Sequence, residues 1–192
     1  MTQPSHLVPL AVALLLSVAA IDHSLAQDSA ERIDKSCDRI RCYQPGSFPV
    51  TLNDGSEATF ELKVAVPIVK GDVVSMLPGT TVFVSGSVVE GKLVNLRVVE
   101  KPTELKDVLQ IRMWQEPGMA DTFLVVTNYF HDVVKYRAAM LFPQADEFHS
   151  TSSCAVLGDG RVGYEHWPHA IFQLVLADFV FRSADIEELR CE

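Results

Sequence analysis

The sequence has little positive charge. It contains 16 Lys and Arg residues against 25 Asp and Glu residues, which gives a formal net charge of −9. Nucleic acids and anionic membrane surfaces both repel a protein of this charge. The composition therefore argues against a nucleic-acid partner and predicts contact with a membrane only during export. It permits a cationic partner.

The sequence also lacks the short motifs that identify common enzyme sites. It contains neither a G-x-S-x-G nucleophile elbow nor a phosphate-binding loop that ends in Lys-Ser or Lys-Thr. Asp146, Glu147 and His149 lie shortly before Ser152 and Ser153, but a catalytic triad is recognised by geometry rather than by closeness in sequence. We therefore nominate no catalytic residue, and a binding or structural role is favoured over an enzyme.

No apolar run is long enough to span a bilayer comfortably, which takes about 20 residues. The apolar stretch at residues 7–20 is shorter and is followed by Ser24-Leu25-Ala26, whose small residues suit a signal peptidase. Residues 1–26 are therefore predicted to be a cleavable signal peptide, although no Lys or Arg precedes the apolar stretch. A retained membrane anchor is the alternative. Either way, we expect a periplasmic or secreted protein.

Cysteine is scarce, and all four cysteines follow residue 26: Cys37, Cys42, Cys154 and Cys191. An even number in an exported chain predicts two disulfides. Sequence leaves three pairings open, of which we favour Cys37–Cys42 with Cys154–Cys191. The second bridge would tie the C-terminus to the body and contribute about 3–4 kcal/mol through loop closure. A zinc site is less favoured, since structural zinc sites use shorter cysteine spacings.

Amphipathic helices long enough to cross a parallel sheet are absent, and β-strand patterns fill the body. In residues 59–66, apolar side chains alternate with polar ones at the period of a half-buried strand. About seven to nine strands are expected, separated by turn residues. They include residues 59–66, 81–89, 93–99, 108–115, 122–130, 136–142 and 171–182, the last with a bend at Ala177-Asp178.

This pattern predicts an all-β fold, an antiparallel β-sandwich of the Greek-key or immunoglobulin-like kind. The sandwich would form one domain at residues 47–192. Residues 27–46 would form a short irregular N-terminal segment, a linker with a cysteine loop. Architecture of this kind does not define a function.

One segment offers metal ligands: Glu165-His166-Trp167-Pro168-His169. Imidazole and carboxylate groups are donors for zinc or copper. Pro168 disfavours a helix, and in an extended segment His166 and His169 point to opposite sides. We therefore favour a loop that binds no cofactor, and keep a metal-binding protein or metalloenzyme using Glu165, His166 and His169 as the alternative.

The aromatic residues suggest a binding surface. Trp114 shares a strand side with Gln110 and Arg112, and with Tyr129 or Trp167 it would form a platform for a sugar or peptide. The alternative is that Trp114 covers the edge of the core. We expect an exported module that binds a protein or peptide, such as an inhibitor of a cationic partner. Strand addition at a sheet edge is one route.

Overall fold

The computed structural model describes residues 37–183 and residue 191, so the predicted signal peptide lies outside the described residues. The described regular structure is all-β and antiparallel, which confirms the predicted fold class. The strands are β1 (Cys42–Tyr43), β2 (Gly46–Thr51), β3 (Glu57–Leu62), β4 (Val66–Pro67), β5 (Val69–Lys70), β6 (Val73–Met76), β7 (Thr80–Val89), β8 (Lys92–Val99), β9 (Leu109–Gln115), β10 (Thr122–Asn128), β11 (Val133–Leu141), β12 (His149–Thr151), β13 (Arg161–Trp167) and β14 (Gln173–Arg182).

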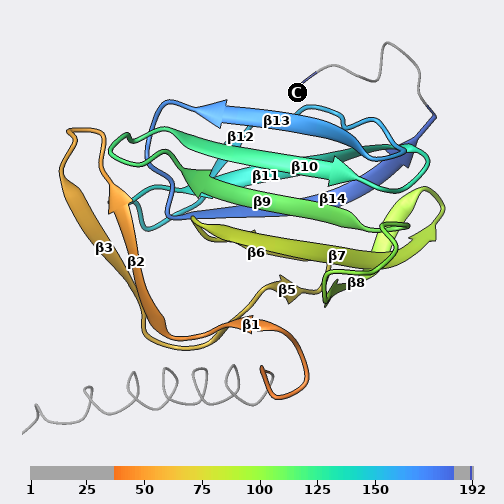
Figure 1. The fold of residues 1–192 in the computed structure, drawn as a ribbon, viewed down its shortest axis with the longest axis horizontal. Helices are drawn as coiled ribbons and strands as arrows, with labels where there is room; N and C mark the ends of the chain where they lie inside the picture. Colours follow the sequence, from red (N-terminus) through yellow and green to blue (C-terminus); the bar gives the residue numbers. More distant parts are fainter. Residues whose placement is uncertain (1–36, 184–190, 192) are drawn as a thin grey trace, which may run out of the picture.

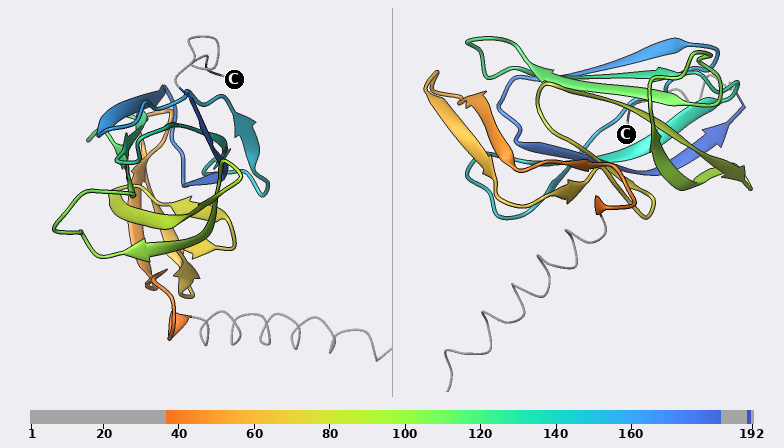
Figure 2. Two further views of the ribbon diagram at one scale, coloured as in Figure 1. Left: turned by 90° about the vertical axis from the view of Figure 1, so that its right-hand side faces the viewer. Right: turned by 60° about the horizontal axis from the view of Figure 1, so that its bottom comes forward.

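The main sheet wraps around a common core and forms the two layers of a sandwich (Figures 1 and 2). Its strand order is β12-β11-β14-β8-β7-β9-β10-β13, and β6 also pairs with β14. One layer contains β9, β10 and β13, and the other contains β11, β12 and β14. The layers connect through β14, which pairs with β6 over Leu174–Leu176 and with β8 at Val180.

The alternation of side chains explains why these segments become half-buried strands. In β9, Leu109, Ile111 and Met113 are 0% exposed, whereas the intervening residues face outward. Full burial of such a side chain stabilises the fold by about 1.5–3 kcal/mol relative to exposure. Every second position of β9 therefore belongs to the core, as the sequence pattern predicts.

Bulges curve the sheet. The bend expected at Ala177-Asp178 is present: Arg137 pairs with Ala177 and Lys135 with Val180, so β14 carries one more residue than β11. Asp178 takes the left-handed conformation with φ 53°. A residue inserted in this way bends its strand and increases the local twist.

The structure corrects several sequence-based boundaries. The strand predicted at 59–66 is β3, which ends at Leu62, and its partner β2 begins inside the segment assigned to the linker. The segment Glu165–Trp167, predicted to be a loop, is the end of strand β13. Its sequence lacks a run of β-branched residues, so the strand depends on pairing with β10 rather than on local propensity.

The β2–β3 hairpin forms its own two-stranded sheet and projects beside one end of the sandwich (Figure 1). Its tip is fixed by side-chain contacts. The Gln115 amide accepts a hydrogen bond from the Thr51 N–H and donates one to the Thr51 carbonyl, both at 2.8 Å. Phe60 also packs on Phe172, with ring centroids 4.7 Å apart. These polar bonds and this ring contact help to seat the hairpin against the sandwich.

Candidate functional site

An aromatic surface covers the outer side of β9, β10 and β13. Two cross-strand rows define it, because paired residues in neighbouring strands point to the same side of a sheet. Phe123 pairs with both Trp114 and His166, and Val125 pairs with both Arg112 and Tyr164. We call this surface the aromatic face; it comprises Arg112, Trp114, Phe123, Val125, Val162, Tyr164 and His166.

Three rings of the aromatic face stack across the strands. The centroids of Trp114 and Phe123 are 5.2 Å apart with an interplanar angle of 19°, and those of Phe123 and His166 are 4.8 Å apart with an angle of 15°. These spacings are close to the separation of neighbouring strands, about 4.8 Å. The rings therefore stand side by side and present their edges to the solvent.

The two ends of this stack differ. At the Trp114 end, the Arg112 guanidinium lies over the indole, 4.8 Å from its centroid, in a cation–π contact. At the His166 end, Nε2 lies 2.6 Å from an Asp121 carboxylate oxygen, which fixes the imidazole against Phe123. The neighbouring Tyr164 and Val162 are 56% and 60% exposed. The aromatic face thus has a rigid row of rings beside accessible apolar groups.

The residues of the candidate metal site do not converge. Glu165 and His166 point to opposite sides of β13, because consecutive residues of a strand alternate. His169 lies beyond the strand, where its Nε2 is 3.4 Å from Met140 Sδ. Within the described residues, no group of three His, Cys, Asp or Glu side chains is arranged to hold a metal. The structure therefore gives no support to the metal alternative.

The three residues of the predicted aromatic platform do not all lie on one exposed surface. Trp114 lies in the aromatic face, but Trp167 is 7% exposed and its indole N–H donates to Thr151 Oγ1 at 3.0 Å. Trp167 is therefore a core residue. Tyr129 lies on the flank of the surface, with its hydroxyl 3.5 Å from Gln110 Oε1. Phe123 and Tyr164 were missed, although Val162, Tyr164 and His166 alternate with smaller or charged residues in the way typical of a strand.

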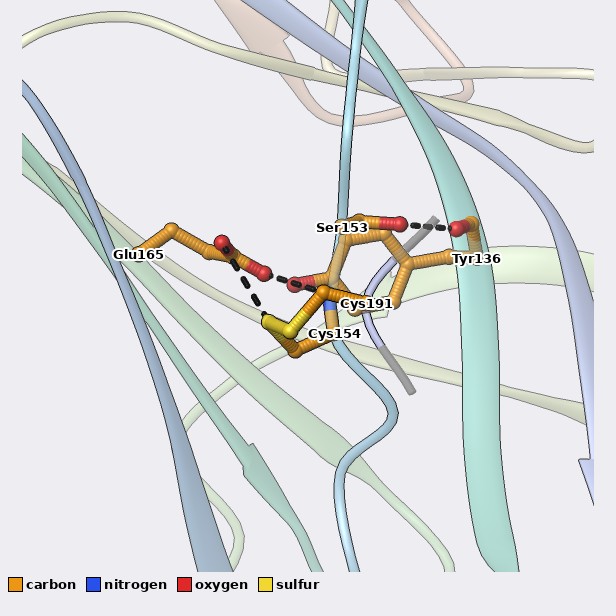
Figure 3. Close-up of a disulfide and its surroundings, with 5 residues drawn as sticks. All are labelled: Tyr136, Ser153, Cys154, Glu165 and Cys191. Carbon is orange, nitrogen blue, oxygen red and sulfur yellow. Dashed lines mark hydrogen bonds between the residues drawn. A yellow bond between two sulfur atoms is a disulfide. The ribbon is translucent and has the colours of Figure 1, made fainter. Parts of the chain in front are cut away.

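On the inner side of β13, Glu165 lies beside the disulfide between Cys154 and Cys191 (Figure 3). Its carboxylate accepts a hydrogen bond from the Cys154 N–H at 2.7 Å and another from Tyr136. Burial raises the pKa of Glu165 because the charged form loses hydration, and the two hydrogen bonds oppose this rise. Glu165 thus holds the cysteine segment against β13 and is turned away from the aromatic face.

The cysteines pair as the sequence analysis favoured, Cys37 with Cys42 and Cys154 with Cys191. Both bridges are typical of an oxidising compartment outside the cytoplasm. In the described part of the chain, no helix has the length and hydrophobicity that a membrane span requires.

Comparison of the chain with protein-family models, with curated proteins and with solved structures finds no match. The fold and the geometry of the aromatic face therefore provide the basis for a functional argument.

Proposed function

We propose that this protein is an exported binding module that holds a protein or peptide partner on the aromatic face. One observation carries the proposal: Trp114, Phe123, Tyr164 and His166 form a contiguous surface with Arg112 on the solvent side of three paired strands. Soluble proteins seldom leave such surfaces exposed unless they bind something. Trp, Tyr and Arg are also the residues that dominate binding energy at protein interfaces.

The packing of the rings favours a protein over a sugar. A sugar binds aromatic residues by lying flat on an open ring face. Phe123 has Trp114 stacked on it from one neighbouring strand and His166 from the other, and Arg112 lies over Trp114. These neighbours take up the ring faces, so a ligand meets ring edges and the exposed Tyr164 and Val162. Such a surface suits the apolar side chains of a protein.

Charge and strand position indicate what kind of partner fits. The chain carries a net charge of −9, and Asp121 lies at the His166 end of the stack. A cationic partner would be attracted by the acidic chain as a whole, and its apolar side chains would pack on the rings of the aromatic face. Within the described residues, β13 pairs with one strand only, β10, so an extended peptide has a strand to align with. An inhibitor of a cationic secreted enzyme is a narrower form of the same function.

The setting of this function is the periplasm or the cell exterior. The two disulfides support an oxidising compartment. We propose that residues 1–26 direct export and are removed, and that the binding function requires neither a cofactor nor nucleic acid.

The test is a selection of displayed peptides on the oxidised, folded protein, followed by affinity measurements on purified peptides. We expect selected peptides to be basic and apolar, and we expect Tyr164→Ala to weaken their binding roughly tenfold or more, the effect of losing an interface hot spot. Val89→Ala is the control, because Val89 is 53% exposed at the end of β7, outside the aromatic face. Peptides that bind the Tyr164→Ala variant as tightly as the unmodified protein would overturn the proposal.

A further inference from the structure

Strand β13 is an edge of the main sheet. The path of paired strands ends in β12 at one side and in β13 at the other, and among the described residues β13 pairs only with β10 (Figure 1). Its seven residues, Arg161–Trp167, match β10 in consecutive pairs without a bulge. The second edge of β13 therefore presents a row of backbone N–H and C=O groups, which are a template for another strand.

This edge lacks the features by which proteins usually protect such strands. Protected edges are short, or they carry lysine, proline or a bulge. The other end of the path, β12, is short, with three residues. By contrast, β13 contains neither Lys nor Pro, and its outer side presents Val162 and Tyr164, which are 60% and 56% exposed. The edge of β13 is therefore open to pairing with a further strand.

The sequence of β13 is complementary to itself when two copies run antiparallel about Gly163. In this register Val162 faces Tyr164 of the second copy on the outer side, and Arg161 faces Glu165 of the second copy on the inner side. An aromatic residue opposite a β-branched one, and two opposite charges, are both favourable cross-strand pairs. Twofold symmetry forms each pair twice. Centring the pairing on Val162 or Tyr164 instead leaves Arg161 opposite an uncharged residue.

The charges of β13 favour a second copy over an uncharged strand. Arg161 is exposed and forms no ion pair with another described residue. Glu165 accepts hydrogen bonds from the Cys154 N–H and from Tyr136, and it too has no ion pair in the part of the chain that the structure describes. An inward-pointing charge such as Glu165 discourages pairing with an uncharged strand. A second copy brings an opposite charge to both residues.

We propose that this protein forms a twofold dimer in which two copies pair their β13 edges about Gly163. The twofold axis is normal to the sheet, so the outer sides of both copies lie on the same side and their aromatic faces join into one surface. The dimer does not rest on the proposed function, because it uses the backbone edge rather than the ring rows. In the dimer this edge is filled, so a bound peptide lies across the rings instead of adding to β13.

Sedimentation velocity of the exported, disulfide-bonded protein, without peptide, tests the dimer. Seven residues a side are fewer than the roughly 20–30 of a standard interface, so we expect an equilibrium that shifts toward dimer as the concentration rises. Arg161→Glu places like charges opposite each other, and Val162→Lys adds a lysine to the edge. Each should raise the dissociation constant roughly tenfold or more.

Val89→Lys is the control, because Val89 is 53% exposed and lies at the end of β7, outside β13. An unmodified protein that stays monomeric up to about 100 μM would overturn the dimer. A control that weakens the dimer as much as the β13 variants do would overturn the assignment to this edge.

The register has its own test. Val162→Glu and Tyr164→Lys should each weaken the dimer, because each places a charge opposite an apolar side chain. The combined variant should dimerise more tightly than either single one, since the two new side chains have opposite charges and face each other across the axis. Both positions are more than half exposed in one copy, so the fold should tolerate the changes. A combined variant without this recovery would overturn the register.

Arg161→Glu also separates the dimer from the proposed function. Arg161 lies outside the aromatic face, so this variant should lose the dimer and still bind the selected peptides. Loss of peptide binding with an intact dimer would contradict the proposed function alone. Peptide binding by an unmodified protein that is monomeric would contradict the dimer alone.

Discussion

The interpretation of Glu165 differs between the sequence and the structure. In the sequence it stands beside two histidines and suggests a metal ligand. In the structure it contacts Cys154 and Tyr136 on the inner side of β13. Because its position is odd-numbered in a strand whose even-numbered side chains face outward, it is separated from His166 by the thickness of the sheet.

We predict that Glu165 makes stability fall as pH rises. Its folded-state pKa is raised, mainly by burial, so the folded protein binds this proton more tightly than the unfolded chain. The favourable contribution is complete below the unfolded pKa, about 4.3. This contribution is lost as the pH rises through the raised folded-state pKa of Glu165. Glu165→Gln should reduce this fall, because the amide keeps an acceptor for Cys154 and does not ionise.

The test is to measure the melting temperatures of the unmodified protein and of Glu165→Gln from a pH below the unfolded-state pKa to a pH above the raised folded-state pKa. Glu116→Gln, at an exposed turn position, is the control and should follow the unmodified protein. If the melting temperature of Glu165→Gln changes with pH in the same way as that of the unmodified protein, ionisation of Glu165 is not the cause of the fall in stability.

At the scale of elements, the β2–β3 hairpin depends on contacts distant in the sequence. Its strands pair with each other from Gly46↔Leu62 to Thr51↔Glu57 and form no ladder with the main sheet. An isolated two-stranded hairpin is marginally stable in water. The contacts of its tip with Gln115 and with the Ala170 N–H, which donates to Asn53 Oδ1 at 3.0 Å, therefore hold it in place.

We predict that Gln115→Ala releases the hairpin. The substitution leaves the Thr51 N–H and carbonyl without this partner, and Thr51 is 5% exposed. The free energy of unfolding should fall by about 1–3 kcal/mol, and the amides of β2 and β3 should exchange hydrogen faster. Gln110→Ala, on the same strand but facing outward, is the matched control. Unchanged exchange in the hairpin would show that other contacts fix it.

At the scale of the whole molecule, the Cys154–Cys191 bridge joins the C-terminus to the segment behind β13. The chain leaves the main sheet at the end of β14 and returns through this bond. Closing a loop of 37 residues lowers the entropy of the unfolded chain. The bridge therefore acts mainly on the unfolded state.

We predict that Cys154→Ser and Cys191→Ser lower the free energy of unfolding by similar amounts, about 2–4 kcal/mol. The double variant should cost no more than either single one, because all three changes remove the same bond. Urea denaturation without reductant measures this. Clearly unequal single effects, or effects that add, would contradict the pairing.

The sequence by itself determined where several strands lie and how their side chains alternate. The alternation in β9 and the bend at Ala177-Asp178 follow from local rules: strands alternate their side chains, and Asp tolerates the left-handed conformation. The cysteine pairing was favoured from loop length, and the structure has the same pairs. The alternation and the bend depend on neighbours along the chain, so local patterns are sufficient to find them, whereas the cysteine pairing was one of three that the sequence left open.

Only the tertiary structure decided which side chains come together on the surface and which enter the core. The aromatic face requires β10 between β9 and β13, and β13 is distant in sequence from β9. Trp167 enters the core because it shares the inner side of β13 with Glu165, and there its indole N–H donates to Thr151. Strand order depends on long-range pairing and shared burial, and these energies exist only once the layers have packed together.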